Sequence, residues 1–242
     1  LKYLEKLARE HRVLKFPEAF NWSKINNFGA ANCEGKFLLF LNNDTEVKEP
    51  EWLVAMLEHA QRRRTGAVGA KLLHPDGTIQ HVGVVIGMGD TAGHPFYHFP
   101  EQILMSHFYY VQLFTIPRNF SAVTGACMMV PRKVFERVRG FDPRFKVAYG
   151  DIDLCLRIRE LGYRIVYTPL AVLYHHDSAT RRGYIPKEDT LLMISKWGAY
   201  IKQGDPYYNF NLALDRADVG LKISNTIDCG TIQEHAWKAK WV

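Results

Sequence analysis

The segment Lys36–Val47, KFLLFLNNDTEV, constrains the fold of this chain more than any other stretch. Its five apolar residues, Phe37–Leu41, follow one another without alternation, which predicts a strand buried on both faces. The run ends abruptly at Asn42, Asn43 and Asp44. A buried strand that ends in polar residues places them at the carboxyl edge of a sheet, where open α/β folds bind ligands. A strand-end turn, in which Asn and Asp bond their own backbone, explains the same residues without a ligand.

Strand and helix patterns alternate after this segment. Trp52–Arg64 carries apolar residues at helical spacing, and Gly66–Leu73 has the pattern of a second strand. A strand, a helix and a strand of these lengths form a βαβ unit, so the two strands are expected to be parallel. Further along, Arg164–Tyr167 and Ala171–Tyr174 are expected to form two short strands that Pro169 separates. The pattern therefore predicts an α/β fold.

The start of the chain differs from the usual start of such a fold. Leu1–His11 has the spacing of a helix, whereas a doubly wound fold normally begins with a strand. Arg12–Phe16 is the first strand expected, and Ser23 is the expected N-cap of the helix that follows. We therefore expect the chain to be a fragment of a longer protein, or to have been cut at its N-terminus.

Composition and charge argue against some classes of protein. The 242 residues are 47% hydrophobic, which is ordinary for a globular protein of one sizeable or two small domains. No apolar run in the sequence reaches the length of a membrane span. The formal net charge of +6 suits an anionic ligand or an acidic membrane surface, but the interleaved basic and aromatic residues of nucleic-acid-binding proteins are missing. The four scattered Cys, without a CxxC, indicate reduced thiols in a cytosolic protein and argue against a zinc site built on Cys.

Acidic residues open the helix that is expected to start near residue 150. Asp151 and Asp153 lie in its first turn, where the helix dipole favours negative charge. Asp153 and Arg157 have the spacing of an i, i+4 ion pair, which is a structural role. Asp151, at a helix start that faces a cleft, also has the chemistry of a general base. Both interpretations of Asp151 stay open at this point.

Two histidines and two arginines follow the last expected strand. His175 and His176 are adjacent, and neighbouring strand residues point to opposite sides, so at most one of them is expected to face a given site. An imidazole together with a distant Asp suits a manganese-like cation. Arg181 and Arg182 form either a solvated basic loop or a clamp that binds a diphosphate through paired hydrogen bonds.

Taken together, these segments resemble the family-2 nucleotide-sugar glycosyltransferases of the GT-A fold, in particular bacterial enzymes of O-antigen and cell-surface polysaccharide synthesis. The resemblance runs from about Phe20 to Leu212. Five segments carry it in order: FNWSKINNFGAANCEGKFLLFLNNDTEV, HPDGTIQHVGVVIG, VTGACMMVPRKVFERVRGFDPRF, YGDIDLCLRIRELGYRIVYTPLAVLYHHDSATRRG and KWGAYIKQGDPYYNFNL. Each one alone is a weak signal, whereas all five in this order are specific.

The resemblance assigns roles to individual residues. Asn42, Asn43 and Asp44 take the place of the family's DxD motif, whose last Asp binds a divalent cation, Mn or Mg, on the diphosphate of the donor. Asp151 matches the family's catalytic base, and Gly150 stands on the acceptor side where the family usually has Glu. The remaining matches are the metal-binding His (His175 first, His176 second), the diphosphate-binding basic loop (Arg181 and Arg182), the acceptor side (Gly125 and Ala126) and a position near the donor diphosphate (Asn27).

The resemblance also implies the architecture. The expected fold is α/β and GT-A-like, with a mainly parallel central sheet flanked by helices and a smaller mixed sheet near the acceptor side. Family members begin with strands that hold the nucleotide base, and this chain begins after them, so it is expected to be truncated at its N-terminus. Residues 1–200 are expected to form the catalytic domain, and residues 201–242 an extension packed on it.

The implied function is inverting sugar transfer from a nucleotide-sugar donor to a glycan or lipid-linked acceptor in cell-surface polysaccharide synthesis. The expected location is cytoplasmic, with peripheral contact at the inner face of the membrane, and self-association is expected if the missing strands leave an apolar edge exposed. No nucleic-acid partner is expected.

Two other functions stay open. The first is a non-catalytic glycan-binding or scaffold module, because the donor half is missing. The second is a metal-dependent phosphohydrolase built on Asp44, His175, His176 and Asp177. The sequence favours it less, because no further cluster of His or carboxylates builds the two-metal clamp that is typical of that chemistry.

Overall fold

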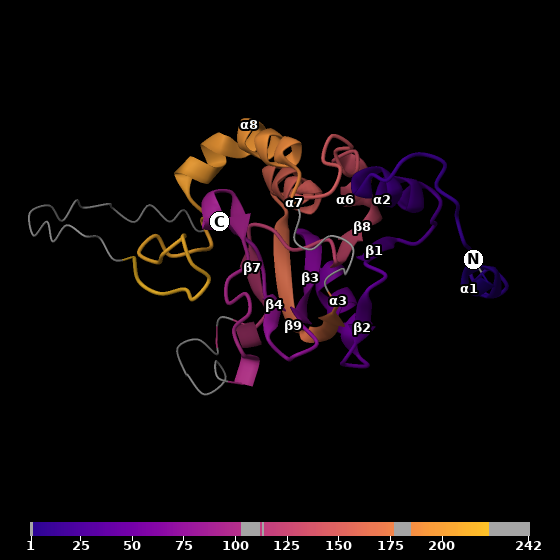
Figure 1. Ribbon diagram of the computed structural model, residues 1–242, viewed down its shortest axis with the longest axis horizontal. Coiled ribbons are helices and arrows are strands. Elements are labelled where there is room, and N and C mark those ends of the chain that lie inside the picture. Colours follow the sequence, from indigo (N-terminus) through magenta and orange to yellow (C-terminus); the bar gives the residue numbers. More distant parts are fainter. Residues whose placement is uncertain (1, 103–111, 113, 177–184, 223–242) are drawn as a thin grey trace, which may run out of the picture.

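The computed structural model describes residues 2–102, 112, 114–176 and 185–222. A seven-stranded sheet forms its centre, with the strand order β1-β8-β3-β9-β2, while β4 pairs with β3 and β7 pairs with β9 (Figure 1). The strands of this sheet are β1 (Phe37–Leu41), β2 (Thr45–Val47), β3 (Thr65–Leu73), β4 (Ile79–His81), β7 (Arg118–Phe120), β8 (Cys127–Pro131) and β9 (Arg164–His175).

The strand directions make this sheet mixed rather than mainly parallel. β3 and β9 are parallel neighbours, while β8 lies between β1 and β3 and is antiparallel to both. The strands of the predicted βαβ unit, β1 and β3, therefore run in the same direction but do not pair with each other. The smaller sheet is an antiparallel pair, β5 (Val85–Ile86) with β6 (Ala92–Gly93). The carboxyl ends of β1, β3 and β9 meet at one edge of the central sheet.

β9 is a single strand, so the prediction of two short strands separated by Pro169 is wrong. The register with β3 jumps at this point: Ala70 pairs with Thr168, and the next residue, Lys71, pairs with Val172. The residues between them form a bulge, which accommodates a proline because its missing N–H is not needed in the ladder. Beyond the bulge, β9 continues to His175.

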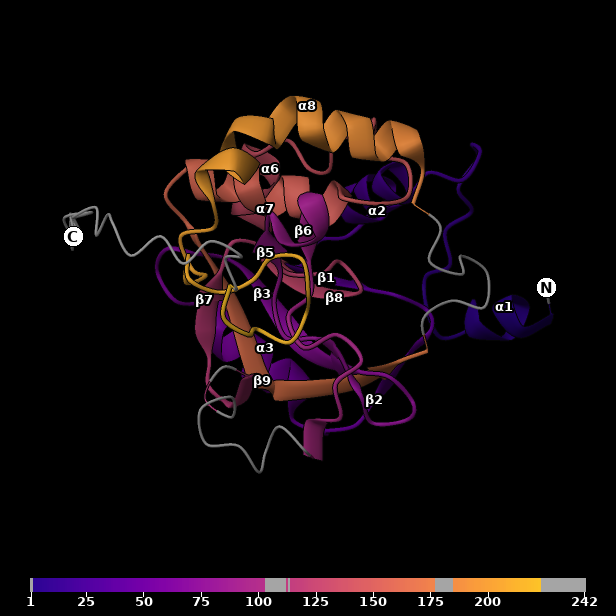
Figure 2. The same cartoon turned by 60° about the vertical axis from the view of Figure 1, so that its left-hand side comes forward.

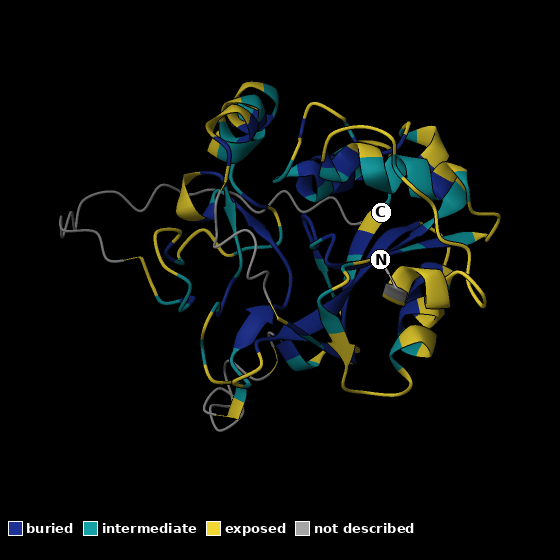
Figure 3. Cartoon of the chain, turned by 45° about the vertical axis from the view of Figure 1, so that its right-hand side comes forward, coloured by how far each residue is buried: buried dark blue, intermediate teal, exposed yellow. Residues whose placement is uncertain are grey.

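Helices cover both faces of the sheet (Figures 1 and 2). On one face lie α2, α6, α7 and α8, and on the other lies α3. Alternation along the strands supplies both layers, because Met128 of β8 packs in the cluster under α7, while its neighbour Met129 packs in the cluster under α3. The strands between the layers, above all β3 and β8, are accordingly buried, whereas the edge strand β2 is partly exposed (Figure 3). The helix bounds are α2 (Trp22–Ala31), α3 (Trp52–Ala60), α6 (Arg132–Arg137), α7 (Gly150–Glu160) and α8 (Lys187–Gln203).

The N-terminal segment only partly follows the sequence prediction. A helix is present, α1 (Lys2–Leu7), and it lies apart from the sheet (Figures 1 and 2). Residues 12–16 form no strand, because they are mostly exposed and pair with none of the described strands. The N-cap of α2 is Asn21 rather than Ser23: the Asn21 side chain accepts from the Lys24 N–H at 2.9 Å.

The segment after α8 runs back over the loop between β5 and β7. Backbone hydrogen bonds join Gly89 N–H to the Leu214 carbonyl at 2.8 Å and Phe96 N–H to the Ala217 carbonyl at 2.6 Å. The expected boundary between residues 200 and 201 falls inside α8, which continues to Gln203. The division of the chain into a catalytic domain and an extension stays a prediction.

We expect Gly66→Ala to destabilise the fold, because β3 and α7 approach each other too closely at Gly66 for a side chain. An added Cβ would overlap a methyl group of Ile158 and lie 2.7 Å from the Tyr163 Cβ. The expected loss is about 1–3 kcal/mol of unfolding free energy, which urea denaturation measures. The matched control is Gly29→Ala, in the interior of α2 with open space around it, where a gain of about 0.5–1 kcal/mol is expected. Equal effects of the two changes would contradict this account of the packing.

Candidate functional site

The edge where β1 and β9 end brings Asp44 and His175 together. Asp44 follows β1, and β2 then pairs antiparallel with β9 so that Thr45 lies opposite His175. As a result, the Asp44 Oδ1 lies 3.0 Å from the His175 Nε2. The Asn42 side-chain nitrogen lies 3.3 Å from the same Nε2. Two side chains that are separated by 131 residues in the sequence thus form one polar pair at the sheet edge.

Gln80 of β4 fixes the orientation of the His175 ring. Its Oε1 lies 2.5 Å from the His175 Nδ1, and its Nε2 faces the His175 carbonyl at 3.4 Å. Since a carbonyl only accepts, the amide nitrogen belongs on that side and Oε1 accepts from Nδ1–H. The lone pair of a neutral His175 is then on Nε2, the atom that faces Asp44. A carboxylate oxygen and this ring nitrogen thus face each other at 3.0 Å.

His176 points away from this pair. Its Nε2 lies 3.2 Å from the Glu46 Oε2 at the exposed surface, although its backbone N–H donates to the Asp44 carbonyl at 2.9 Å. The alternation that the sequence predicted for the two histidines is present, and His175 is the one beside Asp44. Among the described residues, no group of three or more His, Cys, Asp or Glu side chains is arranged to hold a metal ion. Asp177, which the phosphohydrolase hypothesis requires, lies outside the described residues.

Asp151 lies at the start of α7, and backbone donors hold both of its carboxylate oxygens. The Gly125 N–H donates to Oδ2 at 2.7 Å, and the Ile152 N–H donates to Oδ1 at 2.9 Å. The second contact is a helix-start contact of the kind the structural interpretation expects. The first contact ties α7 to the turn before β8. A Cβ on Gly125 would lie 2.5 Å from the Trp22 ring and 3.3 Å from the Asp151 Cβ, so this close approach needs glycine.

A cavity of about 350 Å³ connects the two sites. Asn42 and His175 line it at one end and Asp151 at the other, while Trp22 and Tyr149 contribute aromatic walls. We call it the acid cavity. A neighbouring cavity of about 430 Å³ shares His175 and extends to Asp215 and Arg216 of the C-terminal segment. His175 of the polar pair and the helix-start acid Asp151 therefore line one space of the size of a small ligand, and Asp44 lies behind His175.

Three further residues with predicted roles also lie near the acid cavity. Ala126 and Gly150 line it, and Gly125 holds Asp151 beside it. Gly150 has no room for a side chain, because a Cβ would lie 2.7 Å from the Ser23 Oγ. A Glu at this position is therefore incompatible with the packing of α2 against α7.

The remaining predicted residues lie elsewhere. Asn43 is exposed in the turn after β1 and lines neither cavity. The Asn27 amide is engaged on both sides by Phe141: it donates to the carbonyl at 2.8 Å and accepts from the N–H at 2.9 Å. Arg181 and Arg182 lie outside the described residues. The donor-binding roles of these four residues stay predictions.

Sequence reasoning missed Gln80, His81 and Thr124. They lie in two of the segments that carry the family resemblance, HPDGTIQHVGVVIG and VTGACMMVPRKVFERVRGFDPRF, and that resemblance is the only signal that points to them. Gln80 faces His175, whereas the adjacent His81 is fully buried: its Nδ1 donates to the Ala70 carbonyl at 2.9 Å, and its Nε2 accepts from the Thr124 N–H at 3.2 Å. Burial, and secondarily the nearby His94, lower the pKa of His81 from its ordinary value of 6.5 to about 3.

Comparison with known proteins gives one family and several relatives. A sequence model of the family described as "Glycosyltransferase like family 2" matches residues 6–203. The O-antigen biosynthesis protein RfbC of Myxococcus xanthus is 44% identical over 211 residues, which cover 86% of this chain and 16% of that protein. Protein y4gI of Sinorhizobium fredii is 42% identical over 223 residues, which cover 89% of this chain and 24% of that protein. This chain thus spans less than a quarter of the length of these two curated relatives.

A shorter relative and two solved structures extend the comparison. The N-acetylglucosaminyl-diphospho-decaprenol L-rhamnosyltransferase of Mycobacterium tuberculosis is 30% identical over 135 residues, which cover 53% of this chain and 43% of that protein. GalNAc-T7, solved with UDP, GalNAc and Mn²⁺, superposes with a TM-score of 0.61 at 13% identity, covering 83% of this chain and 40% of that one. The mannosyltransferase PcManGT of Pyrobaculum calidifontis, solved with GDP-Man and Mn²⁺, gives 0.52 at 13% identity, covering 83% and 56%. At this identity the likeness shows the fold alone, and it confirms the expected GT-A-like α/β fold.

The buried His81 predicts a loss of stability in acid. Because His81 is neutral in the folded protein, only the unfolded chain binds its proton as the pH falls below about 6.5, so unfolding is favoured progressively down to about pH 3. Between pH 6.5 and pH 5 this amounts to about 2 kcal/mol, at 1.36 kcal/mol per pH unit. His81→Gln should lower stability at pH 7 but lose about 2 kcal/mol less than the wild type between pH 7 and pH 5, measured by urea denaturation. The control His11→Gln, at an exposed position, should keep the wild-type pH dependence of the unfolding free energy. The same pH dependence in His81→Gln as in the wild type would show that the His81 ring is not held neutral.

Proposed function

We propose that this chain, which belongs to the glycosyltransferase-like family 2, transfers a sugar from a nucleotide-sugar donor to a glycan or lipid-linked acceptor in cell-surface polysaccharide synthesis. The observation that carries the proposal is that His175, which contacts Asp44, and Asp151 line one cavity at the carboxyl edge of the sheet. The names of the relatives, an O-antigen biosynthesis protein and a rhamnosyltransferase, support the class of product.

The residues beside β1 fit a divalent cation. Asp44 supplies a hard carboxylate oxygen, and His175 presents the lone pair of Nε2 because Gln80 accepts from its other ring nitrogen. Carboxylate and imidazole together suit Mn²⁺, the ion present in both related structures, and Mg²⁺ is the alternative. Asn42 adds an amide beside the pair. When bound, such a cation neutralises the charge that develops on a leaving diphosphate.

Asp151 is the proposed catalytic base. The hydroxyl of the acceptor loses its proton to the Asp151 carboxylate while its oxygen attacks the anomeric carbon of the donor. The bond from that carbon to the diphosphate breaks on the opposite face, so the configuration inverts. An ionised carboxylate offers about four lone-pair sites, so the two backbone donors on Asp151 leave room for an acceptor hydroxyl. Trp22 and Tyr149 give the acid cavity the apolar surface on which a sugar ring packs.

The other predicted contacts belong to the same proposal. Arg181 and Arg182 are proposed to bind the donor diphosphate by paired, charge-assisted hydrogen bonds, and Asn27 and Asn43 to contact the donor. Gly125, Ala126 and Gly150 are proposed to bound the acceptor side. In the described part of the chain, no helix is long and apolar enough to cross a membrane. Peripheral association with the inner membrane face, where a lipid-linked acceptor would lie, is part of the proposal, as is self-association through the exposed edge of β1.

The metal assignment predicts that Asp44→Ala loses metal-dependent nucleotide binding. Removal of a metal ligand should weaken Mn²⁺-dependent binding of UDP, GDP or dTDP by more than about 100-fold. Loss of a residue that only hydrogen-bonds to a metal ligand already weakens metal binding by about 10–100-fold. Titration calorimetry with and without Mn²⁺ measures this effect. The matched control is Glu46→Ala, two residues away, whose exposed carboxylate pairs with His176 and should not matter. Equal affinities of the two variants would remove Asp44 from the metal site.

The base assignment predicts that Asp151→Asn stops sugar transfer without weakening nucleotide binding. Asn retains the shape and caps a helix about as well as Asp, but it cannot accept the proton. The transfer rate should therefore fall by about two to four orders of magnitude. The assay combines UDP-, GDP- and dTDP-sugars with N-acetylglucosaminyl-diphospho-decaprenol and records glycosylated product and nucleotide affinity side by side. Wild-type transfer by Asp151→Asn would leave Asp151 with a capping role only.

A further inference from the structure

The loop that leads into α7 forms one wall of the acid cavity. Its residues Val147, Ala148 and Tyr149 line the cavity directly before Gly150 and Asp151. Tyr149 has a φ of 61°, a left-handed conformation that is strained for a bulky side chain and persists only where the surroundings hold it. The position of the proposed base therefore depends on what fixes this loop.

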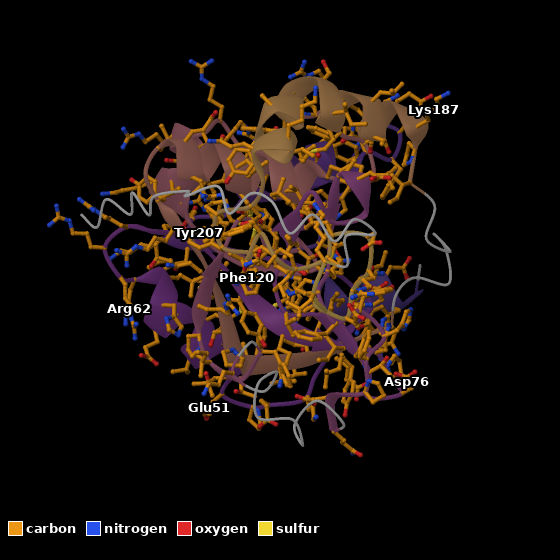
Figure 4. The ribbon with its side chains drawn as sticks, turned by 90° about the vertical axis from the view of Figure 1, so that its left-hand side faces the viewer. Glu51, Arg62, Asp76, Phe120, Lys187 and Tyr207 are labelled. Atoms are coloured by element: carbon orange, nitrogen blue, oxygen red, sulfur yellow. The ribbon has the colours of Figure 1, made fainter. Side chains whose placement is uncertain are left out.

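Asp189, in the first turn of α8, holds the loop from outside the cavity. Its Oδ2 accepts from the N–H groups of Val147 and Ala148, both at 2.8 Å, and its Oδ1 accepts from the Lys146 N–H at 3.2 Å. The Asp189 side chain is fully buried, whereas Lys187 at the start of the same helix points away from the molecule (Figure 4). A buried carboxylate is stable only when such donors satisfy it.

α8 also holds α7 itself. The carboxylate of Asp153, in the first turn of α7 and fully buried, accepts from the indole N–H of Trp197 in α8 at 3.0 Å and pairs with Lys196 of α8. On the other side of the loop, α2 supplies a second support, because Trp22 N–H donates to the Lys146 carbonyl at 2.8 Å. The wall of the acid cavity is thus held between α2 and α8. Among the described residues, only the Asp189 side chain accepts hydrogen bonds from three consecutive backbone N–H groups of this wall.

We propose that Asp189 is a positioning residue for the acceptor: by fixing the amides of Lys146, Val147 and Ala148, it sets the place of Tyr149 and of the Asp151 carboxylate toward the acceptor hydroxyl. The inference rests on the proposed function. It acts on the acceptor side only, because the Asp44–His175 pair is built on β1 and β9 and shares no hydrogen bond with α8 in the described residues. A displacement of a catalytic group by about 1 Å lowers the rate on the order of 100-fold, and an effect of this size is expected when Asp189 is removed.

The test compares Asp189→Asn and Asp189→Ala with Glu188→Gln, the matched control. Glu188 is exposed, lies next to Asp189 and has no bond to the loop among the described residues. With N-acetylglucosaminyl-diphospho-decaprenol as acceptor, Asp189→Ala should raise the acceptor KM and lower the acceptor kcat/KM by about 10–100-fold. The donor KM and Mn²⁺-dependent nucleotide affinity should stay at wild-type values. Asp189→Asn retains one acceptor oxygen and should be milder, and Glu188→Gln should match the wild type.

Two results would overturn the inference. One is wild-type acceptor kinetics in Asp189→Ala. The other is a fall in kcat that is matched by an equal fall in the number of Mn²⁺-dependent nucleotide-binding sites per mole of protein, since a merely structural loss removes active protein and leaves the remaining sites at the wild-type rate. If the wild type neither binds nucleotide nor transfers sugar, the proposed function fails, and amide hydrogen exchange then decides the inference alone. The inference is supported if amide exchange in Asp189→Asn is faster from Lys146 through Tyr149 to Asp151 while exchange in β1 and β9 stays as in the wild type. It is overturned if the faster exchange is confined to the three amides that bond Asp189.

Discussion

The contact between Asp44 and His175 is the interaction on which the arrangement of the site depends. It exists because β9 is long enough to cross the whole sheet and end beside β1's polar turn, and because β2 closes the edge by pairing with the end of β9. The bulge opposite Ala70 and Lys71 lets that strand continue past Pro169. A shorter β9 would leave Asp44 as an ordinary turn residue, and the cavity would lose His175 from its lining.

Each polar group of the site is held by a neighbour from another element. Gln80 of β4 orients the His175 ring, and the turn before β8 holds the Asp151 carboxylate through Gly125. Such supports fix the geometry of functional groups before a ligand arrives, so binding does not have to order them. This packing tolerates few substitutions. Gly125 and Gly150 both lie where a Cβ would collide with α2, so neither position accepts a larger residue unless the elements around the acid cavity shift.

The sequence predicts those parts of the fold that depend on local patterns. The apolar run of β1, the polar residues after it and the acidic start of α7 are visible without a structure, because burial and helix dipoles act on neighbouring residues. The place of β8 between β1 and β3 is not visible, since β8 pairs with strands about 90 and about 60 residues before it in the chain and such pairing leaves no local signal. Ser23 shows the same limit: it has the residue type of an N-cap, but its hydroxyl donates to the Phe145 carbonyl at 2.7 Å, so a long-range partner decides its role.

One arrangement of Asp151 is compatible with both its structural interpretation and its proposed role as a base. The contact to Ile152 is local to the first turn of α7, where the helix dipole favours the negative charge of Asp151. The additional contact to Gly125, across to a different element, turns the carboxylate toward the turn that borders the acid cavity. Each N–H group takes up one lone pair on one carboxylate oxygen and leaves the other lone pairs available. The same hydrogen bonds therefore also fix the orientation of the Asp151 carboxylate. Gly125 and Gly150 permit this approach by their lack of a side chain, so the close packing of α2, α7 and the turn before β8 sets the place of the Asp151 carboxylate beside the acid cavity, as the proposed role as a base requires.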